Sequence, residues 1–202
     1  MTDPGRSERY PLRRRAVAAA LLEARGDLLV VSGLGAPTWD VAAAGDYPLT
    51  FPLWGAMGGA AMMGLGLALA RPERRVLVVT GDGEMLMGLG SLATIGVKRP
   101  ANLAIVVLDN ERYGETGMQA THTAGPADLA AAAKALGFPV TGTVHEQAEL
   151  EAAIPEIRGT TGPVFYDIKV RAEDLPLVMP PKDGILLKDR FRAALLGKEA
   201  GI

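Results

Sequence analysis

The chain has 202 residues, of which 49% are hydrophobic, and this is enough for a single compact domain, residues 1–202, with a substantial core. Its 21 basic and 23 acidic residues give a formal net charge of −2, so neither nucleic acid nor a membrane is expected as a partner. The absence of cysteine excludes disulfides, thiolate zinc sites and cysteine-ligated iron–sulfur clusters, and it favours a cytoplasmic location.

The first third of the chain predicts two helices separated by a strand. Residues 14–24 are expected to form an amphipathic helix, and the basic run 13–15 is interpreted as part of a solvated face. Residues 28–32 are typical of a short buried strand. Residues 56–70 predict a buried helix, because the stretch is shorter than the roughly 20 residues of a membrane span. Its Gly and Ala residues would let another backbone approach closely, either a sheet or a partner subunit.

The rest of the chain alternates strands with helices. Buried strands are expected at 76–80, 103–108, 140–144 and 164–170, and helices at 85–95, 127–136 and 146–154. From about residue 173 prolines predict an irregular tail, with a last short helix at 186–196. The alternation predicts an α/β fold with a doubly wound, mainly parallel sheet and helices on both faces.

Two of the expected strands end on oxygen-bearing side chains. Gly81-Asp82-Gly83 follows one strand, and Asp109-Asn110 follows the next. Because parallel strands bring their carboxyl ends to one edge, Asp82 and Asn110 are expected to lie close together. A carboxylate and an amide carbonyl suit Mg²⁺, which usually completes its coordination with phosphate oxygens. The pattern therefore predicts a metal-bridged diphosphate, next to a helix N-terminus that favours an anion.

The spacing of these residues resembles a known cofactor motif. Gly81-Asp82-Gly83, 26 intervening residues and then Asn110 are similar to the thiamine diphosphate motif of the domain that binds the cofactor's diphosphate. Residues 54–58 resemble the segment of that family that grips the aminopyrimidine ring. Within the family, residues 86–96 and 117–123 look most like phosphonopyruvate and sulfopyruvate decarboxylases, and the likeness covers roughly residues 28–170.

The resemblance assigns roles to individual residues. It implies that the side chains of Asp82 and Asn110 and the backbone carbonyl of Arg112 bind Mg²⁺, and that Gly83 and Glu84 offer N–H groups to the diphosphate.

The resemblance also implies contacts to the rings of the cofactor. Met57 would wedge between the two rings and Gly55 would accept from the pyrimidine amino group, so that the bent cofactor activates itself.

Some positions depart from the family pattern. Asp109 stands where an asparagine is often found, and Arg112 stands where a glycine is common, although only its carbonyl is needed. Glu115 lies one position away from the place where some members of the family have a catalytic glutamate. His122 is the histidine near the expected ligand edge and could act as an acid or base, or simply be a surface residue.

The family also needs a glutamate from a pyrimidine-binding domain, and a chain of this length has room for only one of the two domains. The resemblance thus implies a hetero-oligomer in which a separate pyrimidine-binding subunit supplies that glutamate. The expected function is the thiamine diphosphate- and Mg²⁺-binding subunit of a decarboxylase, a carbon–carbon lyase, acting on a small 2-oxo acid and inactive without its partner. The alternatives are an acetolactate-synthase-like carboligase, a non-catalytic cofactor-sensing module, and a nucleotide-binding module of Rossmann type.

Overall fold

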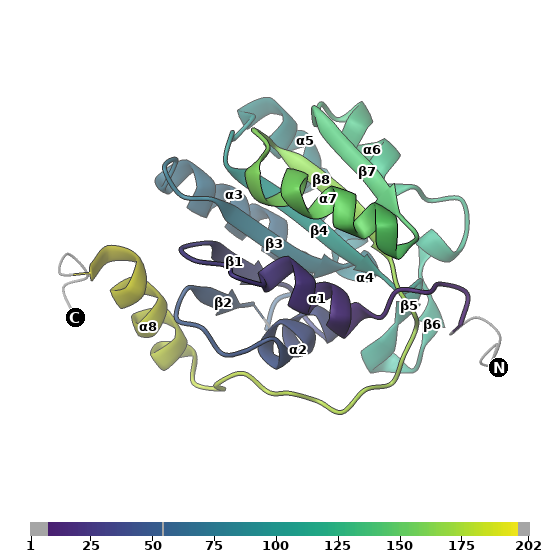
Figure 1. Ribbon diagram of the computed structural model, residues 1–202, viewed down its shortest axis with the longest axis horizontal. Helices are drawn as coiled ribbons and strands as arrows, with labels where there is room; N and C mark the ends of the chain where they lie inside the picture. The colour runs from purple at the N-terminus through teal and green to yellow at the C-terminus, as the bar shows by residue number, and fades with distance from the viewer. Residues whose placement is uncertain (1–7, 54, 198–202) are drawn as a thin grey trace.

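The computed structural model describes residues 8–53 and 55–197, which form a parallel sheet covered by helices on both faces (Figure 1). The order across the sheet is β2-β1-β3-β4-β8-β7, and every neighbouring pair is parallel. The strands are β1 (Leu29–Ser32), β2 (Thr50–Pro52), β3 (Val76–Gly81), β4 (Leu103–Asp109), β7 (Val140–Val144) and β8 (Val164–Lys169). This arrangement confirms the predicted fold class.

The helices divide between the two faces of the sheet. Helices α1 (Arg14–Leu22), α2 (Ala36–Ala43) and α7 (Gln147–Gly159) pack on one face. Helices α3 (Ala60–Ala70), α5 (Gly90–Lys98) and α6 (Leu129–Ala135) pack on the other. Figure 1 shows α1 and α7 in front of the sheet and α3 and α5 behind it.

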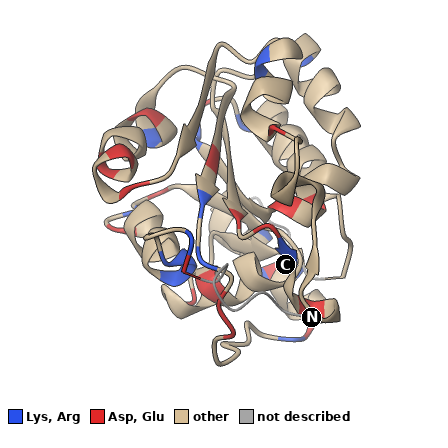
Figure 2. Ribbon diagram, turned by 90° about the vertical axis from the view of Figure 1, so that its right-hand side faces the viewer, with Lys and Arg blue, Asp and Glu red and all other residues tan. Residues whose placement is uncertain are grey.

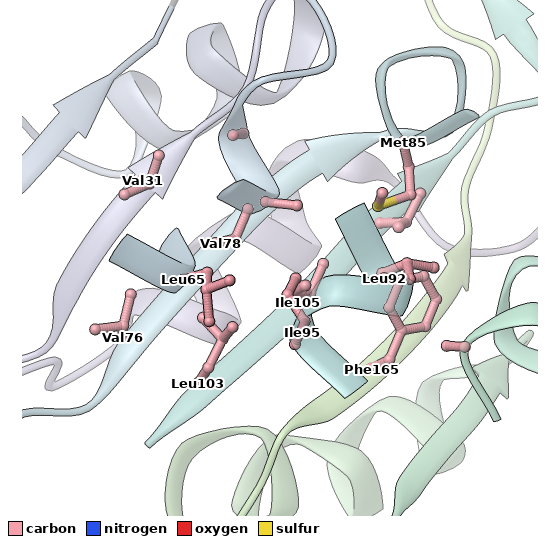
Figure 3. Close-up of a cluster of buried hydrophobic side chains, with 14 of the residues drawn as sticks. Val31, Leu65, Val76, Val78, Met85, Leu92, Ile95, Leu103, Ile105 and Phe165 are labelled. Atoms are coloured by element: carbon pink, nitrogen blue, oxygen red, sulfur yellow. The ribbon is translucent and has the colours of Figure 1, made fainter. Parts of the chain in front are cut away.

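Alternation along the central strands creates both cores. Val78 of β3 and Ile105 of β4 point toward α3 and α5, where they meet Leu65, Leu92 and other buried residues (Figure 3). The intervening residues of the same strands point to the opposite core, against α1 and α7. Since both faces are buried, the strands read as continuous apolar runs, which is why they could be predicted from the sequence.

Three short strands were not predicted. β2 has three residues and ends on Pro52, and β5 (Arg112–Tyr113) and β6 (Gln119–Ala120) have two residues each. β5 and β6 form a separate antiparallel hairpin beyond the end of β4. Segments this short show no hydrophobic period, so a pattern along the sequence cannot reveal them.

The helix predicted at 85–95 was wrong in its bounds, because the chain forms α4 (Asp82–Met87) and then α5. A Cβ atom at Gly88 would lie 2.4 Å from the carbonyl oxygen of Gly58, so this glycine lets the segment before α3 approach the end of α4. The helix predicted from residue 56 was also wrong in its start: α3 begins at Ala60, because Gly58 has a φ of 90°, which an α-helix does not allow.

Helix α7 also differs from its prediction, which ended before Pro155. The helix continues to Gly159 with Pro155 inside it. A capping box between Glu146 and Glu149 and the burial of Ile157 in the core stabilise the helix on both sides of the proline.

An irregular segment of residues 171–183 follows β8, and the basic run 13–15 anchors it. Arg14 is buried, contrary to the prediction of a solvated face: its guanidinium donates to Asp40 at 2.7 Å and to the carbonyl of Glu173 at 2.6 Å. Arg15 donates to the carbonyl of Pro176. The segment then runs along the lower side of the molecule to α8 (Gly184–Leu196), which lies beside β2 (Figure 1).

Charged residues of both signs are interspersed over the molecule (Figure 2). Among the described residues, no helix combines the length and the apolar character that crossing a membrane would require.

Candidate functional site

A cavity of about 770 Å³ opens at the carboxyl edge of the sheet. The chain moves outward from β1 to β2 but in the opposite direction from β3 to β4, so the topological switch point lies between β1 and β3. This is the place where ligands of open α/β sheets bind. The lining includes most of the predicted site residues, namely Met57, Gly81, Asp82, Gly83, Glu84, Asn110, Arg112 and Glu115.

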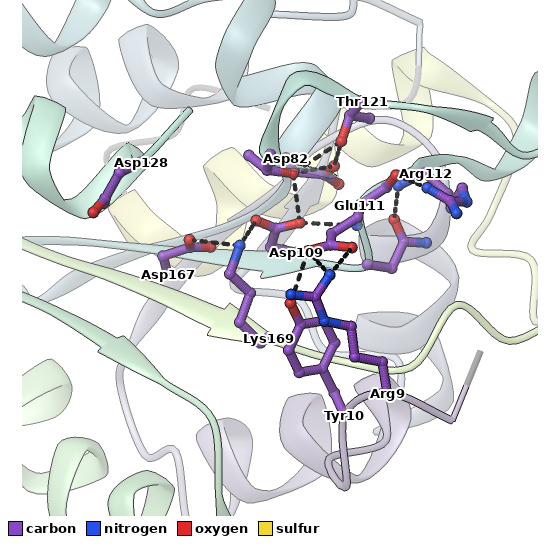
Figure 4. A network of polar contacts seen from close by, with 12 residues as sticks. Arg9, Tyr10, Asp82, Asp109, Glu111, Arg112, Thr121, Asp128, Asp167 and Lys169 are labelled. Atoms are coloured by element: carbon purple, nitrogen blue, oxygen red, sulfur yellow. Dashed lines mark hydrogen bonds and ion pairs between the residues drawn. The ribbon is translucent and has the colours of Figure 1, made fainter. Parts of the chain in front are cut away.

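Asp82 is the first residue of α4, and its side chain is 2% exposed. Its Oδ2 atom accepts hydrogen bonds from the hydroxyls of Thr121 at 2.5 Å and Thr123 at 3.2 Å (Figure 4). Burial, and after it the neighbouring carboxylate of Asp109, raise the pKa of Asp82 to about 7. A buried carboxylate whose ionisation is this costly is well suited to a cation, which would compensate its charge.

Asp109 closes β4 and is buried within a network of polar side chains. The ammonium group of Lys169, from β8, lies 2.5 Å from Asp109 Oδ2 and 3.4 Å from Asp167. On its other side, Asp109 Oδ1 accepts from the Thr123 hydroxyl at 2.8 Å and from the Glu111 backbone N–H at 2.9 Å. All of these partners hold Asp109 as an anchor for the loop that follows β4.

That loop presents Asn110 and Arg112 to the cavity. Asn110 Oδ1 accepts from the Arg112 backbone N–H at 2.9 Å, which leaves a second lone pair on this oxygen. Between them Glu111 has a φ of 60°, a left-handed conformation that is uncommon for a residue with a Cβ atom. The carboxylate of Glu111 accepts from Tyr10 at 2.7 Å and pairs with Arg9 at 3.3 Å, so the N-terminal segment braces the loop (Figure 4).

Glu84 connects the loops around the cavity through its buried carboxylate. It accepts from the Thr80 hydroxyl at 2.6 Å and from the Ala60 backbone N–H at 3.3 Å. A Cβ atom at Gly33, in the loop after β1, would lie 1.6 Å from Glu84 Oε2, so this glycine makes room for the carboxylate. Burial raises the pKa of Glu84.

Two predicted residues do not line the cavity. Gly55 is exposed beside it, and Trp54, the first residue of the same block, lies outside the described residues. His122 is also exposed, whereas its neighbours Thr121 and Thr123 turn inward. Glu115 does line the cavity, where its carboxylate accepts from the Trp39 indole N–H at 2.8 Å.

Sequence reasoning missed several residues of the site. Thr121 and Thr123 entered only as part of a resembling segment, and no role was predicted for Lys169 or Gly33. Their partners lie 14 to 60 residues away in the sequence, and no local pattern indicates such pairings. For the threonines the one signal in the sequence was their spacing, with one threonine on each side of His122.

The oxygen atoms around the cavity fit a divalent cation of the Mg²⁺ type. The carboxylate of Asp82, the amide of Asn110 and the backbone of Arg112 supply the hard oxygens that this ion prefers. Within residues 8–53 and 55–197, no group of three His, Cys, Asp or Glu side chains is placed to hold a metal ion by itself.

Comparison with known families decides the class of the protein. Residues 36–168 match the model of the thiamine pyrophosphate enzyme, C-terminal TPP binding domain. The chain belongs to this family. The matched residues include β3, β4 and the two strand ends that carry Asp82 and Asn110.

Relatives of the chain include decarboxylases. It is 38% identical to the phosphonopyruvate decarboxylase of Streptomyces viridochromogenes, over 98% of this chain and 50% of that protein. It is 41% identical to the sulfopyruvate decarboxylase subunit beta of Methanothermobacter thermautotrophicus, over 75% of this chain and 80% of that subunit. The chain thus spans about half the length of the Streptomyces relative and most of the archaeal one.

A solved structure shows the same fold. The crystal structure of benzoylformate decarboxylase from Polynucleobacter necessarius superposes with a TM-score of 0.69 at 22% identity, over 88% of this chain and 36% of that one. At this level of identity the likeness concerns the fold of the TPP-binding domain.

Proposed function

We propose that this chain is the thiamine diphosphate- and Mg²⁺-binding subunit of a two-subunit decarboxylase that acts on a small 2-oxo acid. The observation that carries the proposal is the placement of Asp82 and Asn110 at the ends of adjacent strands. Gly81 of β3 pairs in register with Leu108 of β4, so the two side chains border the same cavity.

Different residues of the cavity would bind different parts of the cofactor. Asp82, Asn110 and the carbonyl of Arg112 would hold the metal, and the N–H groups of Gly83 and Glu84, in the first turn of α4, would bind the diphosphate. Helix dipole and metal together offset the negative charge of the diphosphate.

Met57 lines the cavity from the segment before α3 and would support the bent cofactor. Thiamine diphosphate, when bound, supplies the nucleophilic carbon and the electron sink that decarboxylation of a 2-oxo acid requires. Gly58 fixes the position of Met57, because it has a φ of 90° and packs closely on the end of α4.

The proposed substrate class comes from the relatives. Both are decarboxylases whose names specify a pyruvate with a phosphonate or sulfonate group. We therefore propose sulfopyruvate or phosphonopyruvate, or a closely similar 2-oxo acid, as the substrate.

The exposed surface of α3 is an argument for a second subunit. Every exposed residue of this helix is apolar: Met62, Met63, Gly66, Leu69 and Ala70. A contiguous apolar stripe of this kind is typical of an interface. Met57, in the segment just before α3, and Met87 are exposed as well, and both line the cavity. The proposed occupant is a pyrimidine-binding chain, since the archaeal relative is a beta subunit.

The test is to co-express the chain with a candidate chain that carries a pyrimidine-binding domain. Release of CO₂ from sulfopyruvate, phosphonopyruvate and pyruvate is then measured with the purified pair and with each chain alone. The proposal predicts CO₂ release that needs both chains, thiamine diphosphate and Mg²⁺. Acetolactate as the main product would indicate a carboligase, and cofactor binding without turnover by a stable pair would indicate a sensing module. Either result would overturn the proposal.

The same pair tests the interface. Met62→Lys should prevent co-purification of the two chains, because a charge in an apolar contact is costly to desolvate. Glu151→Lys changes an exposed residue on α7, on the opposite face of the sheet, and should leave the pair intact. Equal recovery of the pair with both variants would exclude α3 as the interface.

A further inference from the structure

We propose that Thr121 and Thr123 are positioning residues of the metal site, which hold Oδ2 of Asp82 with their hydroxyls so that its other carboxylate oxygen faces the cation. This inference rests on the proposed function, because it concerns the metal that would bridge the cofactor. The inference goes beyond the proposed function, because it gives a role to two side chains that do not themselves bind the metal.

Geometry places both hydroxyls on one oxygen. Thr121 Oγ1 lies 2.5 Å and Thr123 Oγ1 lies 3.2 Å from Asp82 Oδ2, and the two hydroxyl oxygens are 2.9 Å apart. Both threonines are 4% exposed, while His122 between them is exposed. Such a pair of buried hydroxyls on one oxygen restricts the rotation of the carboxylate.

Thr123 also connects the two strand ends. Its hydroxyl lies 2.8 Å from Asp109 Oδ1, and Asp109 immediately precedes Asn110. Each hydroxyl has one proton. The Thr121 proton points to Asp82 Oδ2, and the Thr123 proton is shared between Asp109 Oδ1 at 2.8 Å and Asp82 Oδ2 at 3.2 Å. The threonines thereby connect the carboxylate at the end of β3 to the loop at the end of β4. Figure 4 shows Thr121 beside Asp82, with Asp109 next to them.

This arrangement should matter more for Mg²⁺ than for Ca²⁺. Mg²⁺ demands near-ideal octahedral geometry at about 2.0–2.1 Å, whereas Ca²⁺ accepts longer and more variable contacts. Loosening the Asp82 carboxylate should therefore weaken Mg²⁺ binding selectively. If the threonines had only a structural role, their substitution would lower the affinity for both ions alike, because it would change the site only through the fold.

The experiment measures the thermal unfolding midpoint of the full chain against increasing concentrations of thiamine diphosphate with Mg²⁺ or with Ca²⁺. The dependence of stability on ligand gives the affinity of each complex. The variants are Thr121→Val and Thr123→Val, with Thr121→Ser and Thr123→Ser as rescues that keep the hydroxyl. Thr94→Val, at an exposed position on α5, is the control.

The valine variants should lose about 10- to 100-fold in affinity for the Mg²⁺ complex, the usual effect of removing a group that orients a metal ligand, and only a few-fold for the Ca²⁺ complex. The serine variants should bind as the unaltered chain does. If a valine variant does not fold, Thr121→Ala and Thr123→Ala remove the hydroxyl without placing a methyl group on the carboxylate.

Unchanged Mg²⁺ affinity in the valine or alanine variants, or equal losses for both ions, would overturn the inference while leaving the proposed function in place. If the unaltered chain is not stabilised by thiamine diphosphate with either ion, the metal–diphosphate site itself is wrong, and the proposed function falls with the inference.

Discussion

The two loops that border the cavity are held in different ways. After β3 the backbone enters α4 at once, so Asp82 is placed by a regular strand and a regular helix. After β4 the chain turns irregularly, and side chains from distant parts of the molecule hold Asp109 and Glu111, among them Lys169 from β8 and Tyr10 from the N-terminal segment.

This contrast shows that the backbone of the first loop is set by local structure, even though two threonine hydroxyls hold its aspartate side chain, whereas the second loop depends on long-range contacts along its whole course. The backbone of the first loop needs little support from elsewhere, and its aspartate is expected to act directly on the ligand. The second loop depends on the buried ion pair between Lys169 and Asp109 and on the hydrogen bond from Tyr10 to Glu111. Substitutions that remove these contacts should therefore first reduce the free energy of unfolding.

The largest effect is expected from Asp82→Ala. Without the carboxylate the site has no charged protein ligand for the metal, so Mg²⁺-dependent binding of thiamine diphosphate should fall by more than about 100-fold. The free energy of unfolding should change little, because relief of a buried and costly charge offsets the loss of the hydrogen bond from Thr121. Calorimetry and urea unfolding measure the two effects.

A matched control for this change is Asp128→Ala. Asp128 caps α6 by accepting from the Ala131 N–H at 2.8 Å, so its loss should cost about 1 kcal/mol of stability and no cofactor affinity. Unchanged cofactor affinity in the Asp82 variant would refute its assignment as a metal ligand.

The second loop should respond most strongly to Lys169→Met. This change leaves Asp109 and Asp167 buried without their cation, and removal of one partner of a buried ion pair typically costs about 3–5 kcal/mol. The free energy of urea unfolding is the measurement. Adding Asp109→Asn should restore part of the loss, since it removes one buried charge. A loss below about 1 kcal/mol would show that the loop does not depend on this pair.

A smaller effect is expected where the two loops touch. A Cβ atom at Gly83 would lie 2.3 Å from the ring of Tyr113, so Gly83→Ala should displace the tyrosine and cost about 1–3 kcal/mol. Gly90→Ala meets no atom within 4 Å and should be neutral or stabilising. Thermal unfolding of both variants checks the difference, and equal midpoints would mean that the loops can move apart freely.

The smallest effect is expected from Tyr10→Phe, which removes the hydrogen bond from the N-terminal segment to Glu111 in the second loop. Burial, followed by the hydrogen bond to Glu111, raises the pKa of Tyr10 to about 12. Because the folded-state pKa lies above the ordinary value of 10, the protonated hydroxyl stabilises the fold below pH 10, and this contribution is lost as the pH rises through about 12.

The variant should therefore be less stable than the unaltered chain by about 1 kcal/mol near neutral pH, and the difference should shrink above about pH 10. Urea unfolding across this range is the measurement. Tyr166→Phe, whose partner Glu156 faces solvent, should cost less. A difference that persists unchanged at alkaline pH would show that the hydroxyl does not act through this hydrogen bond.

The same contrast explains what could be predicted from the sequence. The central strands and Asp82 follow from apolar runs and a local motif, and the structure places Asn110 at the same cavity. The hydroxyls on Asp82 and the ammonium group on Asp109 could not be predicted, because their partners meet only when β4, β8 and the chain after β6 come together. The burial of Arg14 was missed for the same reason, since Asp40 and Glu173 are remote in sequence.

The closeness of Gly33 to Glu84 has an evolutionary consequence. A side chain at position 33 would occupy the volume of the carboxylate, since even a Cβ atom there would lie 1.6 Å from Glu84 Oε2. The two positions should therefore covary: homologues with a larger residue in place of Gly33 should carry a shorter one in place of Glu84, and substitution of either position alone should be selected against.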